Sequence, residues 1–229
     1  MNALELKQTR RQRGWTQEEA ALRLGVSQSY LALLESGKRE FGPKLARKAV
    51  NVLKLSPMVL PPSEHLALRV KPQNLAQQLA SLGYPGFAYL RAAKKRNPFE
   101  VLMTALAQDD LESRLTEALP WLLLHYSDTS SQWLVDQARL RNLSNRLGFV
   151  VTLAKGVSER QGDTHSKRYQ ALVCLEQQLA ESRLDKEDTL CQSSLSQMER
   201  TRMKETRPPE AVYWHLLTDW KPEHLQYAV

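Results

Sequence analysis

Residues 16–37, TQEEAALRLGVSQSYLALLESG, constrain the fold more than any other stretch of the chain. Thr16 stands before a helical pattern and Glu19 follows three residues later, which is the arrangement of a capping box at a helix start. Gly25 ends this pattern, because glycine readily adopts the positive φ that closes a helix. Ser27 then caps a second helical pattern that runs to the end of the stretch. Two short helices joined by so tight a turn must cross steeply.

Steeply crossed helices of this kind form a helix-turn-helix, whose second helix enters the major groove of DNA. The stretch also fits the pattern T-Q-x-x-x-A-x-x-x-G-V-S-x-x-x-L-x-x-x-E-x-G. The matching residues are Thr16, Gln17, Ala20 with Ala21, Gly25, Val26, Ser27, Leu31, Glu35 and Gly37. By this pattern, residues 3–54 resemble the lambda-repressor and Cro type (XRE family) of helix-turn-helix regulator. The resemblance implies a compact N-terminal domain of four to five helices.

The second helix of the motif carries the residues that we expect to contact bases. Gln28, at its start, can make a bidentate contact to adenine N6 and N7. Ser29 can meet a base edge, and Tyr30, a departure from the small residue of lambda repressor, can contact a thymine methyl or the backbone. The resemblance further implies that Gln17 contacts phosphate and supports Gln28.

Basic residues around the motif predict contacts to phosphate. The residues expected to contact or support the DNA backbone are Gln17, Ser27, Lys38, Arg39 and Lys44. By resemblance, Arg10 pairs with Glu35 and ties the first helix to the recognition helix. We interpret that pair as structural.

The excess of positive charge is concentrated near the N-terminus. Residues 1–54 hold 11 lysines and arginines against 5 glutamates, a net charge of +6. The remaining 175 residues hold 21 basic and 20 acidic groups, a net charge of +1. Since a concentrated positive field favours a polyanion, the charge indicates double-stranded DNA as the partner of the N-terminal segment.

Composition and apolar spacing predict an all-α fold. Only 9 of 229 residues are glycine, and apolar residues recur every three or four positions, as in a helical bundle. Four prolines between residues 55 and 72 predict a linker, because Pro-Pro pairs break helices. We therefore expect a helix-turn-helix domain over 1–54, a proline-rich linker over 55–72 and a multi-helix bundle over 73–229.

Proline, glycine and Asn or Asp positions divide the bundle region into separate helical patterns. The expected helices are 74–82, 86–95, 98–108, 111–125, 131–142, 144–160, 164–184, 186–204 and 209–217. In the N-terminal domain, helices are also expected over 4–13 and 44–53, with a fifth near the linker.

No motif predicts catalysis, a cofactor or a metal site. The five histidines lack the spacing of metal ligands, and neither G-x-S-x-G nor a phosphate-binding glycine loop occurs. Asp109, Asp110 and Glu112 precede a helical pattern, where negative charge is favoured by the helix dipole. We therefore expect a protein that is not an enzyme. An enzymatic site would need a set of residues that only folding could assemble.

The chain also lacks signs of secretion or membrane insertion. Its two cysteines are too few for a disulfide framework, and its apolar runs fall far short of the roughly 20 residues that span a bilayer. We expect a soluble, cytoplasmic bacterial protein. Near the C-terminus, Trp214 and Trp220 serve either as core anchors or, with Tyr213 and Tyr227, as part of a protein interface.

The main functional expectation is a sequence-specific DNA-binding transcriptional regulator, a repressor acting as a homodimer on a palindromic operator. Residues 133–154 have a likeness to antitoxin-like regulators of the abortive-infection type. That likeness implies an autoregulating antitoxin of a toxin-antitoxin operon, which binds its toxin through residues 73–229. The alternative is a repressor whose helical domain senses a small-molecule effector in an apolar cavity.

Overall fold

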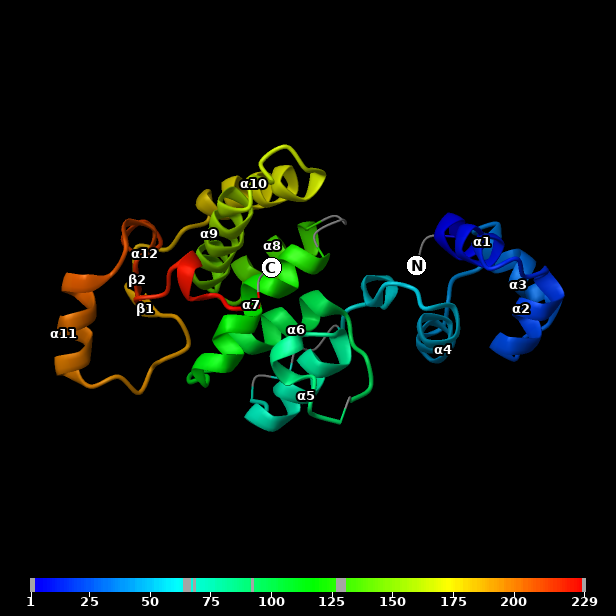
Figure 1. Cartoon of the computed structure of the whole chain (residues 1–229), viewed down its shortest axis with the longest axis horizontal. Coiled ribbons are helices and arrows are strands. Elements are labelled where there is room, and N and C mark those ends of the chain that lie inside the picture. The colour runs from blue at the N-terminus through cyan, green and yellow to red at the C-terminus, as the bar shows by residue number, and fades with distance from the viewer. Residues whose placement is uncertain (1–2, 64–66, 68, 92, 127–130, 228–229) are drawn as a thin grey trace. The chain divides into compact units, whose positions relative to one another are not determined.

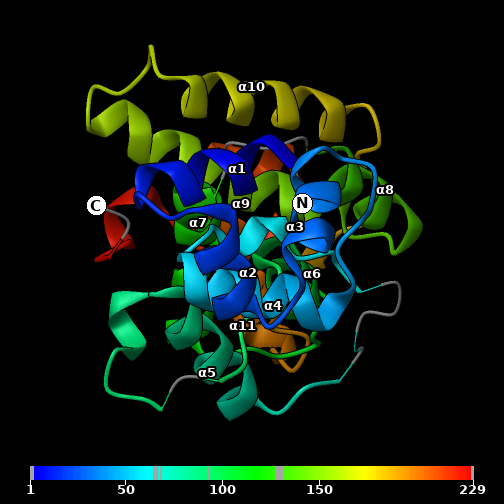
Figure 2. The same cartoon turned by 90° about the vertical axis from the view of Figure 1, so that its right-hand side faces the viewer.

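The structure is a computed structural model that describes residues 3–63, 67, 69–91, 93–126 and 131–227. The chain divides into two compact units. The N-terminal unit comprises residues 1–63 and 95–97, and the C-terminal unit comprises residues 64–94 and 98–229. Figure 1 labels the elements along the chain, and Figure 2 shows them after a quarter turn.

The N-terminal unit consists of four α-helices and a short 3-10 turn. They are α1 (Ala3–Gln12), α2 (Gln17–Leu24), α3 (Gln28–Glu35), α4 (Pro43–Leu53) and η1 (Pro57–Val59). Every one of these elements contributes apolar side chains to one core, among them Leu6, Leu24, Leu31 and Val50. The expected four- to five-helix domain is confirmed, with η1 where the fifth helix was predicted.

Part of the predicted linker is folded into this core. Leu55, Val59 and Leu60 are buried with the side chains of the four helices. Ser56 starts the turn, since its side chain accepts a hydrogen bond from the backbone N–H of Met58 (3.3 Å). The prolines predicted a linker here, but the apolar side chains of residues 55–60 pack into the core instead. The first unit therefore extends beyond residue 54.

The C-terminal unit is built from the remaining helices. Its elements are α5 (Pro72–Leu82), η2 (Pro85–Phe87), α6 (Pro98–Leu106), α7 (Ser113–Tyr126), α8 (Gln132–Leu140), α9 (Ser144–Arg160), α10 (Lys167–Ala180), β1 (Asp188–Thr189), α11 (Gln197–Thr206), α12 (Pro209–Tyr213), β2 (Leu216–Leu217) and η3 (Pro222–His224). The central helix is α9, which packs against α6, α7, α8, α10, α12 and η3. In both views α10 lies beside α9 (Figures 1 and 2). The predicted all-α fold class is confirmed.

Two predicted helices are largely absent. Of residues 86–95, those that the structure describes form only the turn η2 and then irregular backbone. Like charges three and four residues apart, here Arg91, Lys94 and Lys95, disfavour a helix. In the range 186–204 the helix begins only at Gln197. Before it, residues 188–189 pair in parallel with residues 216–217 as β1 and β2.

Trp214 anchors the C-terminal segment to α9. The indole is fully buried, and its N–H donates to the Thr152 hydroxyl (2.9 Å). Gly148 lies under the indole ring, so that a Cβ atom there would come within 2.4 Å of it. The core interpretation of Trp214 is therefore correct. Tyr227 also lies against a core residue, since its ring centre is 5.7 Å from that of Tyr84.

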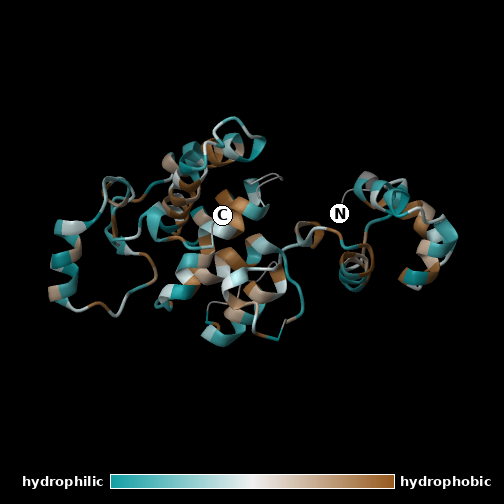
Figure 3. Cartoon of the chain, in the orientation of Figure 1, coloured by the Kyte–Doolittle hydropathy of each residue, from teal (hydrophilic) through white to brown (hydrophobic). Residues whose placement is uncertain are grey.

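The helix α11 differs from its neighbours because it buries no residue. Figure 3 shows it mostly in hydrophilic and neutral colours. Ser196 and Glu199 form a capping box at its start. Its contacts are therefore the cap and surface ion pairs such as Lys204 with Glu187 (3.0 Å) rather than core packing.

The contact between Gly148 and Trp214 gives a stability prediction. Gly148→Ala forces a methyl group into the rigid indole ring, and we expect a loss of about 1–3 kcal/mol or more in the free energy of unfolding. The higher helix propensity of alanine, about 1 kcal/mol, only partly offsets this loss. Urea unfolding followed by circular dichroism measures the change.

Gly42→Ala is the matched control. Gly42 has an ordinary φ of −66°, and the methyl group of an alanine at this position would meet no atom within 4 Å. We expect a loss of at most about 1 kcal/mol there, because alanine is a poorer N-cap than glycine. Equal unfolding midpoints for the two variants would contradict the packing of Trp214 on α9.

Candidate nucleic-acid interface

Local hydrogen bonds set the two helices of the motif at their crossing. The Thr16 hydroxyl accepts from the Glu19 backbone N–H (3.1 Å), and the Glu19 carboxylate accepts from the Thr16 backbone N–H (2.8 Å). Gly25 ends α2 with φ +69°. Ser27 caps α3 by accepting from the backbone N–H of Tyr30 (3.2 Å). The predicted capping box, turn and second cap are all present.

A buried ion pair joins α1 to α3. Arg10 donates through Nε to Glu35 Oε1 (2.6 Å) and through Nη2 to Glu35 Oε2 (3.1 Å). Its third group, Nη1, donates to the Trp15 carbonyl (2.7 Å). From α2, the Gln17 amide donates to Glu35 Oε2 (2.9 Å). This set of bonds holds three helices together through one carboxylate.

The environment of Glu35 favours its charged form. Burial opposes ionisation, but the hydrogen bonds from Arg10 and Gln17 outweigh burial and lower the pKa of Glu35 below its ordinary value. The predicted pair is therefore present in the structure, with side chains only 10% (Arg10) and 3% (Glu35) exposed.

The helix α3 buries one face and exposes the other. Leu31 and Leu34 lie in the core, whereas Gln28, Ser29 and Leu33 are exposed. At 3.6 residues per turn, Ser29 and Leu33 project to the same side of the helix, and Gln28 lies at the edge of that side in the first turn. The exposed face thus offers an amide, a hydroxyl and an apolar side chain.

The sequence analysis did not single out Leu33 as a residue that contacts bases. In the structure Leu33 is 37% exposed beside the residues predicted to contact bases. The signal that could have found it is its position four residues after Ser29, which places the two on one helix face.

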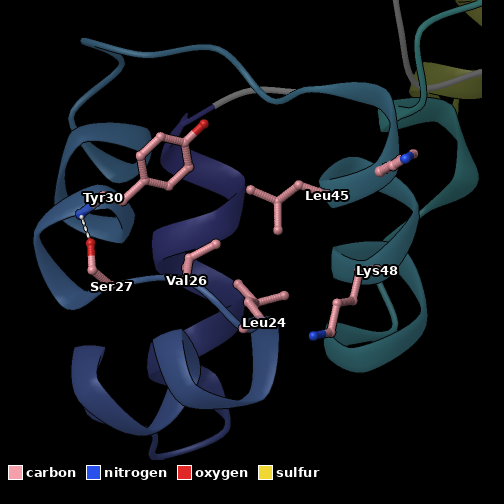
Figure 4. Close-up of a pocket in the computed structure, with 8 residues that line it drawn as sticks. Leu24, Val26, Ser27, Tyr30, Leu45 and Lys48 are labelled. Atoms are coloured by element: carbon pink, nitrogen blue, oxygen red, sulfur yellow. Dashed lines mark hydrogen bonds between the residues drawn. The ribbon is translucent and has the colours of Figure 1, made fainter.

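Tyr30 lies at the margin of this face. Its ring is half-buried against the core, and the Arg39 guanidinium is 6.0 Å from the ring centre. On that side an open groove of about 530 Å³ separates the turn before α3 from α4. Figure 4 shows Leu45 and Lys48 of α4 facing Tyr30 and the turn across this groove.

A rim of positive charge borders the exposed face. Lys38 and Arg39 are exposed in the loop after α3, and Lys44 is exposed in the first turn of α4. The N-cap of that helix, Gly42, offers no side-chain hydrogen bond and Pro43 has no N–H, so the first N–H groups that α4 can offer to an anion are those of Lys44 and Leu45. Lys48, which the sequence did not single out, adds a cation at the groove.

The charge asymmetry is sharper in the structure than along the sequence. The N-terminal unit holds 13 basic and 5 acidic residues, a net charge of +8. The C-terminal unit holds 19 basic and 20 acidic residues, a net charge of −1. The whole positive excess of the chain therefore belongs to the unit that carries α3.

Of the residues predicted to meet DNA, the structure brings most onto one surface. Gln28 and Ser29 share the exposed face of α3, with Tyr30 at its margin, and the predicted basic residues lie on its rim. Gln17 is placed differently from the expectation, since its amide is bound to Glu35. Whether it also supports Gln28 on DNA stays a prediction.

Residues 6–60 match the model of the family described as Helix-turn-helix. The N-terminal unit is a helix-turn-helix domain. The match agrees with the XRE-type resemblance and supports a DNA-binding transcription regulator. It extends to Leu60, the last residue of the buried core, rather than ending at residue 54. No curated protein and no solved structure matches the chain.

Two other kinds of site do not occur in the part of the chain that the structure describes. Among the described residues, no helix combines the length and apolar character that crossing a bilayer requires. In the same residues, no three His, Cys, Asp or Glu side chains are grouped as metal ligands.

The Arg10–Glu35 pair gives a second stability prediction. Arg10→Met leaves the Glu35 carboxylate buried without its main partner, and we expect a loss of about 3–5 kcal/mol in the free energy of unfolding. The matched control is Arg139→Met. Its partner is Glu181, and the two side chains are 43% and 75% exposed, so we expect a loss of at most about 1 kcal/mol. Equal losses in chemical unfolding would contradict the structural role of the buried pair.

Glu35 also predicts a dependence of stability on pH. Its folded pKa lies below that of an unfolded glutamate, about 4.3. Its contribution is therefore complete above about pH 4.3 and is lost as pH falls through the lower folded value. In Glu35→Gln the stability should fall less steeply on acidification than in the wild type. Parallel acid unfolding curves for the two proteins would show that Glu35 does not have a lowered pKa.

Proposed function

We propose that the protein is a sequence-specific transcriptional repressor that inserts α3 of its helix-turn-helix domain into the major groove. The observation that carries this proposal is the exposed face of α3, which offers Gln28, Ser29 and Leu33 beside a positively charged rim. A helix of eight residues with one buried face fits the width of the groove, about 12 Å.

Each residue of the exposed face has a distinct role in base recognition. The Gln28 amide donates to and accepts from one adenine at N6 and N7. Ser29 hydrogen-bonds a neighbouring base edge, and Leu33 contacts a thymine methyl group. The recognition helix therefore selects a sequence that contains adenine and thymine.

Contacts to phosphate position this helix. Lys38 and Arg39 hold the backbone on one side of α3, and Lys44 holds it at the N-terminus of α4. Ser27 remains the cap of α3, and Tyr30 packs against the sugar-phosphate backbone with Arg39 above its ring. These contacts supply affinity without sequence preference.

We further propose that two copies bind a palindromic operator and exclude the transcription machinery from it. One recognition helix of eight residues reads only a few base pairs. A homodimer doubles the recognised sequence, because dimers of this motif place two recognition helices one DNA turn apart.

For the C-terminal unit, we propose a partner-binding role as the antitoxin of a toxin-antitoxin operon. The support is the likeness of residues 133–154, which lie in α8, α9 and the turn between them. Most of α9 is buried, so a toxin would contact other helices. Co-purification of a protein encoded in the same operon tests the proposal, and its absence from a complex with the full chain opposes it.

The effector-sensing alternative would use a different part of the same unit. A pocket of about 430 Å³ lies beside Asn142, Asn145 and Asp188. The residues that line it are mainly polar and charged rather than apolar as expected. A ligand there would be a small polar molecule, and loss of DNA affinity on its addition would favour this alternative.

Base recognition can be tested on duplexes that the wild-type protein selects from a random library. Gln28→Ala should weaken binding to the selected sequence by about 1–3 kcal/mol and relax discrimination at one base pair. Leu33→Ala should reduce discrimination between thymine and uracil, which lacks the methyl group. Fluorescence anisotropy at fixed salt measures both effects.

Lys38→Ala is the control for a contact to phosphate. It should weaken binding to all sequences alike and reduce the slope of log affinity against log salt by about 0.9. Unchanged discrimination in both Gln28→Ala and Leu33→Ala would contradict the assignment of α3 as the recognition helix.

A further inference from the structure

A second cluster of positive charge lies outside the helix-turn-helix motif. Residues 91–96, RAAKKR, here called the basic segment, contain four cations in six positions. No acidic residue occurs between Glu64 and Glu100. The positive charge of the basic segment is therefore not interrupted by carboxylates along this stretch of the chain.

The described residues of the basic segment form neither helix nor strand. Arg91 and Lys94 are exposed, and Lys95 is half-buried. Six residues of chain span at most about 20 Å, so the four cations lie close together whatever the backbone conformation. The self-repulsion of such a cluster is relieved when a polyanion binds.

Asn97 attaches the end of the basic segment to the DNA-binding unit. Its amide donates to the carbonyl of Leu60 (2.7 Å) and lies 3.4 Å from that of Met58. Asn97 is only 4% exposed, and Leu60 belongs to the core of the helix-turn-helix domain. Lys95 and Arg96 are therefore part of the N-terminal unit although 35 residues of sequence separate Lys95 from Leu60.

We propose that the basic segment is a second DNA-backbone contact of this protein, separate from the helix-turn-helix motif. This inference rests on the DNA-binding function proposed above. The anchor at Asn97 favours DNA over other polyanions, because it ties Lys95 and Arg96 to the unit that holds α3, and Arg91 and Lys94 precede Lys95 by at most four residues. The contact adds affinity for duplex flanking the recognised bases and carries no sequence information.

The test uses the full chain with Arg91→Ala, Lys94→Ala and Lys95→Ala combined. The matched control is Lys167→Ala, Lys186→Ala and Arg202→Ala, which removes three exposed cations from the C-terminal unit. Binding of both variants to the selected duplex is measured at several salt concentrations. A third variant, which combines Arg91→Lys, Lys94→Arg and Lys95→Arg, keeps the charge.

We expect the slope of log affinity against log salt to fall by about 0.9 for each cation in contact, and thus by up to about 2.7 in the triple alanine variant. Discrimination between the selected and a mismatched duplex should stay unchanged. The control and the charge-keeping variant should retain the wild-type slope. Unfolding midpoints equal to that of the wild type confirm that the variants are folded.

The ways in which the proposal can fail are distinguishable. If the wild type binds DNA specifically but the triple alanine variant keeps its slope, the basic segment does not contact DNA and the proposed function stands. If the triple alanine variant binds duplex DNA like the wild type but loses affinity for single-stranded RNA or for an acidic protein, the basic segment likewise does not contact DNA. If the wild type shows no specific duplex binding, both the function and this inference are wrong.

Discussion

The orientation of the recognition helix depends on one buried carboxylate. Glu35 receives hydrogen bonds from Arg10 of α1 and from Gln17 of α2 while it is itself the last residue of α3. A buried charge is costly unless it is paired and hydrogen-bonded, so the three helices are favoured only in the arrangement that satisfies it. That arrangement also fixes which side of α3 faces the core. The same arrangement leaves Gln28, Ser29 and Leu33 exposed.

In the C-terminal unit, Arg146 is the centre of a similar cluster of hydrogen bonds. Its guanidinium forms two bonds to Asp188, at 2.7 and 3.0 Å, and donates to the carbonyls of Leu106 and Gln108, each at 2.9 Å. It thereby joins the central helix α9 to β1 and to the end of α6. In both units an arginine satisfies backbone carbonyls as well as a carboxylate, which suits its planar set of donors. Polar bonds specify the register of helices whose apolar contacts alone would tolerate several arrangements.

Sequence reasoning succeeded where the structural signal is local. The bond between Thr16 and Glu19 spans three residues, as does the cap of α3 at Ser27, so a short window contains all partners. It failed where the partners are distant, as for Asp188, which is 42 residues from Arg146 and which leads into a strand that no local pattern indicates. Leu33 shows a second limit. Helical spacing identifies a helix but does not determine which borderline residue the neighbouring helices leave exposed.

The domain boundary shows the same limit in another form. A linker at the prolines suggests that residues 1–72 could be isolated as a complete DNA-binding domain. Such a fragment would lack Asn97, whose amide hydrogen-bonds the Leu60 carbonyl at the edge of the core. It would also lose Lys95 and Arg96, which raise the net charge of the unit from +6 to +8. The extent of the DNA-binding unit is therefore set by packing and not by a single boundary along the sequence. Its charge and its stability both depend on residues that follow the linker.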